Sequence, residues 1–142
     1  MAFMDQSRKA ARAPKVKAIL KKYGVKGTLS VRNHSTLVLN VKSGKINFIE
    51  NYIKTDTDKP HAGKMSQDQI DYIRTHGNLD VNPYWFQEHF SGKAKSFLTE
   101  VFAALKGDDY FDETNAQIDY FHTSHYCDVN IGQWNKPYVL EK

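Results

Sequence analysis

The chain has 142 residues, of which 40% are hydrophobic and 13% aromatic, and its formal net charge is +4. This length and composition favour one globular domain and exclude disorder along the whole chain. No run of 18 apolar residues occurs and Cys127 is the single cysteine, so we expect neither a membrane-spanning helix nor internal disulfides.

The positive charge is concentrated at the N-terminus. Residues 1–26 hold eight basic residues and one acidic residue, a net +7, whereas the remaining residues sum to −3. This asymmetry indicates a polyanion or an acidic protein surface as a partner, or else a solvated helix face without one. Because no apolar stretch follows the basic segment, it is not a secretory signal, and we expect a cytoplasmic protein.

We expect residues 1–13 to form a basic arm and residues 14–142 a single domain. Pro14 suits the first position of a helix, and Gly24 suits its end. Between them, apolar residues recur at helical spacing: Val16, Ile19, Leu20 and Tyr23. The intervening lysines lie mostly off this stripe, which predicts a short amphipathic helix with a basic outer side.

Two segments after this helix alternate between apolar and polar residues, which is typical of strands with one buried face. Leu29 and Val31 belong to the first segment, and Leu37, Leu39 and Val41 belong to the second. The residues between them, 33–35, are Asn-His-Ser and favour a turn. The sequence therefore predicts a β-hairpin that ends at Gly44.

The middle of the chain reads as helices joined by loops. Residues 45–53 favour a short helix over a strand, and residues 54–64 form a polar loop that could contact a partner. Ser66 and Gln69 have the spacing of a capping box, so a helix begins at Ser66. Residues 81–90 are rich in aromatic side chains, for which we favour core packing over a stacking site.

The C-terminal half begins with the clearest helix, over residues 92–106, which Gly107 ends. An acidic loop follows at 108–113, and residues 117–133 read as a second hairpin. The apolar residues of the tail could dock back on the domain. Together these elements predict an α+β fold: a single domain with two antiparallel β-hairpins in one sheet and two to four helices packed on one face.

Two short motifs could carry phosphodiester chemistry. His34-Ser-Thr36 and His122-Thr-Ser124 resemble the paired motifs of two-histidine phosphodiesterases, in which one histidine is the base, the other the acid, and the hydroxyls hold the phosphate. Such an enzyme would act on a cyclic nucleotide or RNA. The tripeptides are short enough to recur by chance, so His34, Thr36, His122 and Ser124 are weak catalytic candidates.

Other chemistry has less support from the residues. His122 and His125 with Asp119 or Asp128 could ligate a metal, but single histidines near aromatic residues are more often packed or exposed, and we expect neither metal nor cofactor. Cys127 lies in an apolar alternation and reads as a buried thiol. Nucleic-acid binding is supported by a candidate basic patch on the first helix and the strand after it: Lys15, Lys21, Lys22, Lys26 and Arg32.

Residues 26–44, together with Asp119-Tyr-Phe and the run from Tyr126 to Tyr138, resemble small bacteriophage and mobile-element proteins related to the large polyvalent protein-associated domains. The resemblance spans Lys15 to Leu140. It implies a phage-encoded accessory protein in the host bacterial cytoplasm, to which no catalytic residues can be assigned.

We therefore expect, first, a non-enzymatic protein that binds and inhibits or modifies a host complex, such as a defence complex. The alternatives are nucleic-acid binding through the basic helix and, after it, the phosphodiesterase. Exposed strand edges would also allow two copies to pair as a homodimer.

Overall fold

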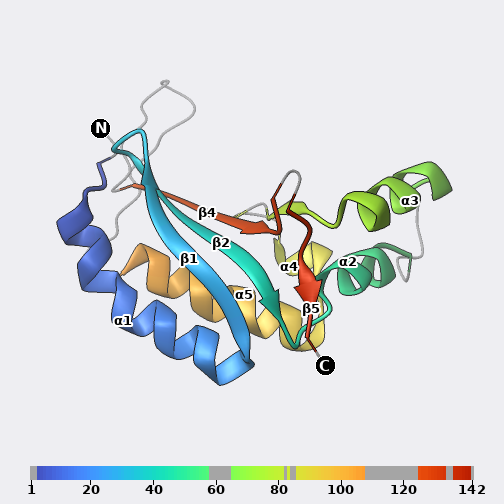
Figure 1. The fold of residues 1–142 in the computed structure, drawn as a ribbon, viewed down its shortest axis with the longest axis horizontal. Coiled ribbons are helices and arrows are strands. Elements are labelled where there is room, and N and C mark those ends of the chain that lie inside the picture. Colours follow the sequence, from blue (N-terminus) through green and yellow to red (C-terminus); the bar gives the residue numbers. More distant parts are fainter. Residues whose placement is uncertain are drawn as a thin grey trace.

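The computed structural model describes residues 3–57, 65–81, 83, 86–107, 125–133 and 136–141 (Figure 1). The described helices and strands follow one another along the chain in this order: α1 (Gln6–Tyr23), β1 (Val25–Arg32), β2 (Thr36–Gly44), α2 (Phe48–Thr57), α3 (Gln67–His76), β3 (Leu79–Val81), α4 (Phe86–His89), α5 (Gly92–Lys106), β4 (Tyr126–Ile131) and β5 (Val139–Leu140).

The strands form one mixed sheet in the order β1-β2-β4-β3, with the short β5 also paired to β2. β1 and β2 form the antiparallel hairpin, with Leu29 opposite Leu39. β2 then pairs in parallel with β4, with Leu39 opposite Val129, and β3 adds to β4 in the antiparallel direction. The centre of the sheet is therefore the pair β2–β4, whose strands are distant in sequence.

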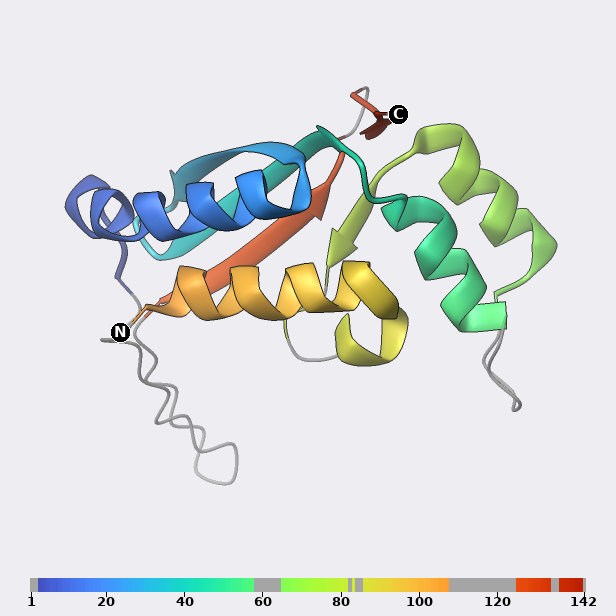
Figure 2. The same cartoon turned by 90° about the horizontal axis from the view of Figure 1, so that it is seen from below.

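Helices α1 and α5 pack side by side on one face of the sheet, and α2 and α3 lie at one end of it (Figures 1 and 2). The face under α1 and α5 carries the inward residues of the strand alternation, among them Leu37, Leu39 and Val129, which are fully buried. From the helices, Val16 of α1 and Phe97 and Val101 of α5 complete this core. Period-two strands and period-3.6 helices thus meet along their apolar sides.

The opposite face of the sheet is polar. Its cross-strand pairs include the ion pair between Arg32 and Asp128 (3.0 Å) and the amide hydrogen bond from Asn130 to Asn40 (3.0 Å). Val38 lies on this face, and it is buried outside the main core cluster. This alternation explains why polar residues occupy every second position of β1 and β4.

The α+β class and the first hairpin are confirmed. The second predicted hairpin is replaced, within the described residues, by a different pairing: β4 lies between β2 and β3. Residues 117–121, which were to be its first strand, lie outside the described residues, as does the acidic loop at 108–113. The polar loop at 54–64 is shorter than expected because α2 continues to Thr57, and its residues 58–64 are outside the described part.

The first helix differs from the prediction at its start. Instead of an arm over residues 1–13, α1 begins at Gln6, where the Asp5 carboxylate caps it by accepting the Arg8 N–H (2.8 Å). Met4 is fully buried, and its N–H donates to the His34 carbonyl (2.7 Å). Pro14 lies inside the helix, on its exposed side, so the carbonyl that loses its usual donor can face water.

The aromatic segment and the tail pack into the core as predicted, as far as they are described. Phe86 stacks on Phe102 of α5 (centroids 4.8 Å apart), and Phe90 lies against Phe48 of α2. Tyr138 of the tail is buried, meets Phe48 edge to face, and donates its hydroxyl to the Ile46 carbonyl (2.6 Å). Tyr84, Trp85 and Trp134 lie outside the described residues.

Candidate functional site

The lysines predicted on the first helix are exposed. Lys15, Lys21 and Lys22 are all exposed on the surface of α1. Lys22 forms an ion pair with Glu100 of the neighbouring helix α5 (3.0 Å), and the Tyr23 hydroxyl donates to the same carboxylate. The hydrogen bond from Tyr23, followed by that from Lys22, lowers the pKa of Glu100, so this carboxylate is already paired.

Lys26 and Arg32 do not join these lysines. Both belong to β1 and project on the polar face of the sheet, opposite α1. There Lys26 pairs with Glu141 (3.2 Å) and Arg32 pairs with Asp128 (3.0 Å). The five-residue patch expected from the sequence is therefore divided between two faces of the molecule, and two of its members are engaged in ion pairs.

The fold instead brings three other lysines to one hollow, and one of them, Lys45, lies at the C-terminal end of α1. Lys45 follows β2, and its aliphatic stem covers Gly24, the residue that ends α1, while its N–H donates to the Gly24 carbonyl (3.1 Å). Lys54 of α2 and Lys93 of α5 line the same hollow as Lys45. We call Lys21, Lys22, Lys45, Lys54 and Lys93 the lysine cluster.

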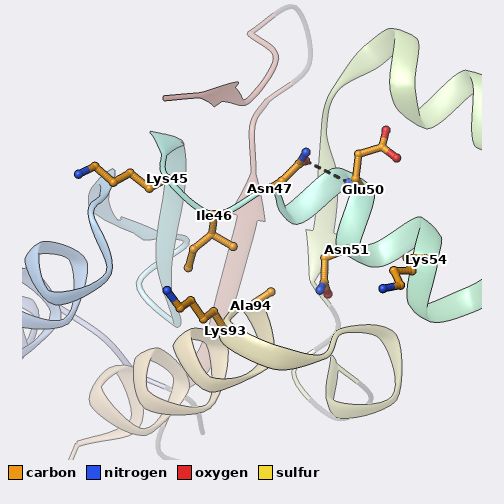
Figure 3. Close-up of a pocket in the computed structure, with 8 residues that line it drawn as sticks. All are labelled: Lys45, Ile46, Asn47, Glu50, Asn51, Lys54, Lys93 and Ala94. Atoms are coloured by element: carbon orange, nitrogen blue, oxygen red, sulfur yellow. Dashed lines mark hydrogen bonds between the residues drawn. The ribbon is translucent and has the colours of Figure 1, made fainter. Parts of the chain in front are cut away.

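The hollow beside these lysines has a volume of about 430 Å³ and lies between the β2–α2 connection, α2 and the first turn of α5 (Figure 3). Ile46 and Ala94 contribute apolar surface to it. Asn51 fixes its walls, because its side chain accepts the Ser91 N–H (3.0 Å) and donates to the Ser91 carbonyl (3.1 Å). This pair of hydrogen bonds ties α2 to the start of α5.

The carboxylates among the lysines are occupied by other cations or donors. Glu50 lines the hollow, but its carboxylate accepts two hydrogen bonds from Arg74 of α3 (2.8 and 2.9 Å). These hydrogen bonds lower the pKa of Glu50. Lys21, Lys45, Lys54 and Lys93 form no ion pair within the described part of the chain. Lys45 adds to the lowering of the Glu141 pKa, which the hydrogen bonds from Ser43 and Lys26 dominate. Among the described residues, Lys21, Lys54 and Lys93 therefore carry positive charge that no carboxylate pairs with.

The first turn of α5 adds to this excess of positive charge. A helix N-terminus is stabilised by acidic residues and by a capping side chain. The first turn of α5 instead contains Lys93 and Lys95 with no acidic residue, and its N-cap Ser91 makes no capping hydrogen bond with its side chain. Sequence analysis missed Lys45 and Lys93 and included Lys54 only as part of the polar loop at 54–64. Two lysines in the first turn of a helix that lacks an acidic residue were a visible signal for Lys93.

The histidine motifs are only partly described. His34 lies exposed in the β1–β2 turn with a positive φ of 54°, and Thr36 is buried at the start of β2. His122 and Ser124, the second motif, lie outside the described residues, so the convergence that a phosphodiesterase requires stays a prediction. His125 is fully buried and bonds through Nε2 to the Leu105 carbonyl (2.8 Å), which is a structural contact.

The proposed metal ligands and the thiol show no catalytic arrangement. Of the four candidate ligands, His122 and Asp119 are outside the described residues, His125 bonds to backbone and Asp128 pairs with Arg32. Across the residues that are described, no group of three or more metal-ligating side chains occurs. Burial raises the pKa of the Cys127 thiol to about 12 and outweighs the opposing effect of Lys106 and Arg12.

Comparison with protein-family models, curated proteins and solved structures finds no match for this chain. None of the described helices has the length and apolar character needed to cross a membrane. The lysine cluster and its hollow are thus interpreted from their own geometry and charge.

Proposed function

We propose that this protein binds nucleic acid through the lysine cluster at the junction of α1, α2 and α5. One observation supports the proposal: Lys45, Lys54 and Lys93 come from three separate segments and line one hollow, while the Glu50 carboxylate beside them is already paired with Arg74. A phosphate backbone offers one negative charge per nucleotide, and its contacts with lysine supply affinity by releasing counterions. Phosphate contacts position a protein on nucleic acid without reading its sequence.

The described surface supports backbone binding better than base recognition. The lysines end in mobile ammonium groups that act as point charges, and Tyr72 and Tyr126, two exposed aromatic residues, lie on other elements. We therefore expect affinity with little dependence on sequence and a strong dependence on salt.

The other expected functions stay predictions. The same lysines would attract an acidic protein, so a host complex as partner is the outcome to be separated from nucleic acid. Nucleic-acid binding by the lysine cluster does not depend on the resemblance to phage proteins. A role against host defence, which that resemblance implies, stays a separate prediction. The phosphodiesterase depends on His122 and Ser124, which are not described.

The test is the affinity of the full chain for short fluorescent DNA and RNA, measured by anisotropy across a range of salt. With about four phosphate contacts, affinity should fall about 100-fold between roughly 50 and 200 mM salt. The double variant Lys21→Gln/Lys45→Gln should weaken binding and reduce the salt slope by about two. Lys22 is left unchanged because its loss would also remove the ion pair with Glu100 and leave that carboxylate with Tyr23 alone.

The control is Lys9→Gln, which removes one charge from α1 at a position about 18 Å from Lys21 along the helix axis, and it is compared with the single variant Lys21→Gln as well as with the double variant. It should bind as the unaltered protein does. Absence of salt-dependent binding, or equal effects of the control and the double variant, would contradict the proposal. Capture of an acidic protein that survives nuclease and high salt would favour the host-complex alternative instead.

A further inference from the structure

We infer that the polar face of the sheet, opposite α1 and α5, binds a single strand of nucleic acid by stacking its bases. The inference rests on the proposed function and adds to it the form of the nucleic acid and a second contact surface. Figures 1 and 2 show α1 and α5 on one side of the sheet, and none of the described helices covers β1, β2 and β4 from the other side.

The strand register places two flat side chains on this face. Arg32 of β1 and Tyr126 of β4 both lie opposite Thr36 of β2, so their backbones are about 10 Å apart across that strand. The Arg32 guanidinium reaches over β2 to Asp128 (3.0 Å), and its side chain is still 54% exposed. Tyr126 is 49% exposed. Aromatic rings and guanidinium planes are the groups on which proteins stack unpaired bases.

Beyond this pair, hydroxyl and amide groups line the face. Thr28 and Ser30 of β1 are exposed, and Asn130 of β4 donates to Asn40 of β2 (3.0 Å). Hydroxyls and amides both donate and accept hydrogen bonds, as the edges of bases do. The exposed carboxylate of Asp80 lies in β3, beyond β4. The nucleic-acid strand is therefore placed over β1, β2 and β4.

The polar face leads to the lysine cluster at the end of β2. Lys42 is exposed on this face and forms no ion pair within the described part of the chain. Lys45, a member of the cluster, follows three positions later. From Thr36 to Lys42, β2 is about 20 Å long. One strand can thus place bases on Tyr126 and Arg32 while its backbone continues to the lysines.

Stacking on this face requires a strand whose bases are free. In a duplex each base is covered by its neighbours, so the duplex offers the protein its phosphates and groove edges but no free base face. The lysine cluster serves both forms, whereas the polar face distinguishes between them. Because every base has a flat face, this preference does not require a particular sequence.

The test compares a single strand of about ten nucleotides with the duplex of the same sequence, on the full chain, by fluorescence anisotropy. The single strand should bind more tightly. Tyr126→Ala should weaken its binding about 5- to 140-fold, the effect of one lost base stack, and leave duplex binding unchanged. Unchanged duplex binding also shows that the variant is folded. Tyr126→Phe should keep the preference.

The matched control is Tyr72→Ala, which removes an exposed tyrosine from α3 and should alter neither affinity. An abasic strand separates stacking from charge, because it keeps the phosphates and lacks the bases. Its affinity should not respond to Tyr126→Ala. DNA and RNA strands of one sequence identify the sugar, since tighter binding of one form assigns the face to that form.

Two results would overturn the inference. The first is equal binding of single strand and duplex, without any effect of Tyr126→Ala, while the salt dependence of binding leaves the proposed function standing. The second is a dimer that forms without nucleic acid and dissociates in the Tyr126→Ala variant, which would assign the polar face to a second copy of the chain. Absence of binding to every strand would contradict the proposed function as well.

Discussion

At the scale of single residues, Arg12 joins the start of the chain to the end of α5. Its buried guanidinium donates to the carbonyls of Leu105 (3.1 Å) and Lys106 (2.9 Å), which lie where helix carbonyls lack partners within the helix. His125 bonds to the same Leu105 carbonyl. Gly107 has a φ of 76°, and a Cβ there would lie 2.8 Å from the guanidinium, so only glycine leaves room.

We expect Arg12→Ala to lower the free energy of unfolding by about 2 to 3 kcal/mol, because it removes the guanidinium that bonds to the Lys106 carbonyl and one of the two side chains that bond to the buried Leu105 carbonyl. Urea denaturation followed by circular dichroism measures this change. Lys17→Ala, at an exposed position of the same helix, should stay within about 0.5 kcal/mol of the unaltered protein. Equal stability of the two variants would show that Arg12 does not anchor α5.

Cys127 should be almost unreactive in the folded protein. A pKa raised to about 12 keeps the thiol neutral, since a raised pKa disfavours the thiolate. At pH 8 the thiolate fraction is then about 10⁻⁴, against about one quarter for an ordinary thiol. Iodoacetamide should therefore modify Cys127 orders of magnitude more slowly in buffer than in urea, and the folded rate should rise with pH beyond pH 9. Comparable rates in both solvents would exclude the burial described.

Single-residue sequence reasoning recovers Cys127 and misses Arg12. The alternation around Cys127 indicated burial, because strand periodicity is local. Arg12 counted only as one of the basic residues, since its carbonyl partners lie more than 90 positions away. The same separation hid the lysine cluster, whose members come from α1, α2, α5 and the connection after β2.

At the scale of elements, helices with local end signals are the predictable part. The helix over residues 92–106 coincides with α5, and the Ser66 capping box is present at the start of α3. The start of α1 was missed because Pro14 has a strong preference for the first turn, whereas here Asp5 caps the helix earlier. Local patterns thus give element identity more reliably than they give the starting residue.

The capping box makes a testable contribution to α3, in which Ile70 is the buried residue. Ser66→Ala removes the hydroxyl that accepts the Gln69 N–H (3.3 Å), and we expect a loss of about 1 kcal/mol that falls mainly on this helix. Hydrogen exchange should become faster for amides of α3 and stay unchanged for those of β2. A uniform increase over both elements would show that α3 opens only with the whole domain.

At the scale of the whole molecule, the order of the strands in the sheet could not be predicted from local sequence patterns. Alternation predicts which face of a strand is buried, but it does not select the neighbour. β2 and β4 can pair in parallel because α5 runs back to the end of the sheet at which β2 begins: His125, just before β4, bonds to the Leu105 carbonyl of α5, and the Tyr126 N–H donates to the Ser35 carbonyl before β2. The tail closes this arrangement, because the Tyr138 N–H donates to the Gly77 carbonyl (2.8 Å) and the Glu141 N–H donates to the Gly44 carbonyl (2.7 Å).

Two variants of Tyr138 separate packing from hydrogen bonding in this closure. Tyr138→Phe keeps the ring against Phe48 but leaves the Ile46 carbonyl without its donor, and it should cost about 1 to 2 kcal/mol. Tyr138→Ala also removes the ring and should cost about 3 to 5 kcal/mol. Thermal unfolding measures both, and a Tyr138→Ala variant as stable as the unaltered protein would show that the tail is not part of the core.

The parallel pairing at the centre of the sheet also governs how the chain must behave while it is being synthesised. Val41 of β2 pairs with Ile131 of β4, which leaves the ribosome 90 residues later. Because the ribosome adds about 5–20 residues per second, the edge of β2 and its apolar side chains stay unpaired for roughly 5 to 18 seconds before β4 is synthesised. During that interval the nascent hairpin presents an open strand edge, the surface that chaperones shield and that aggregation exploits.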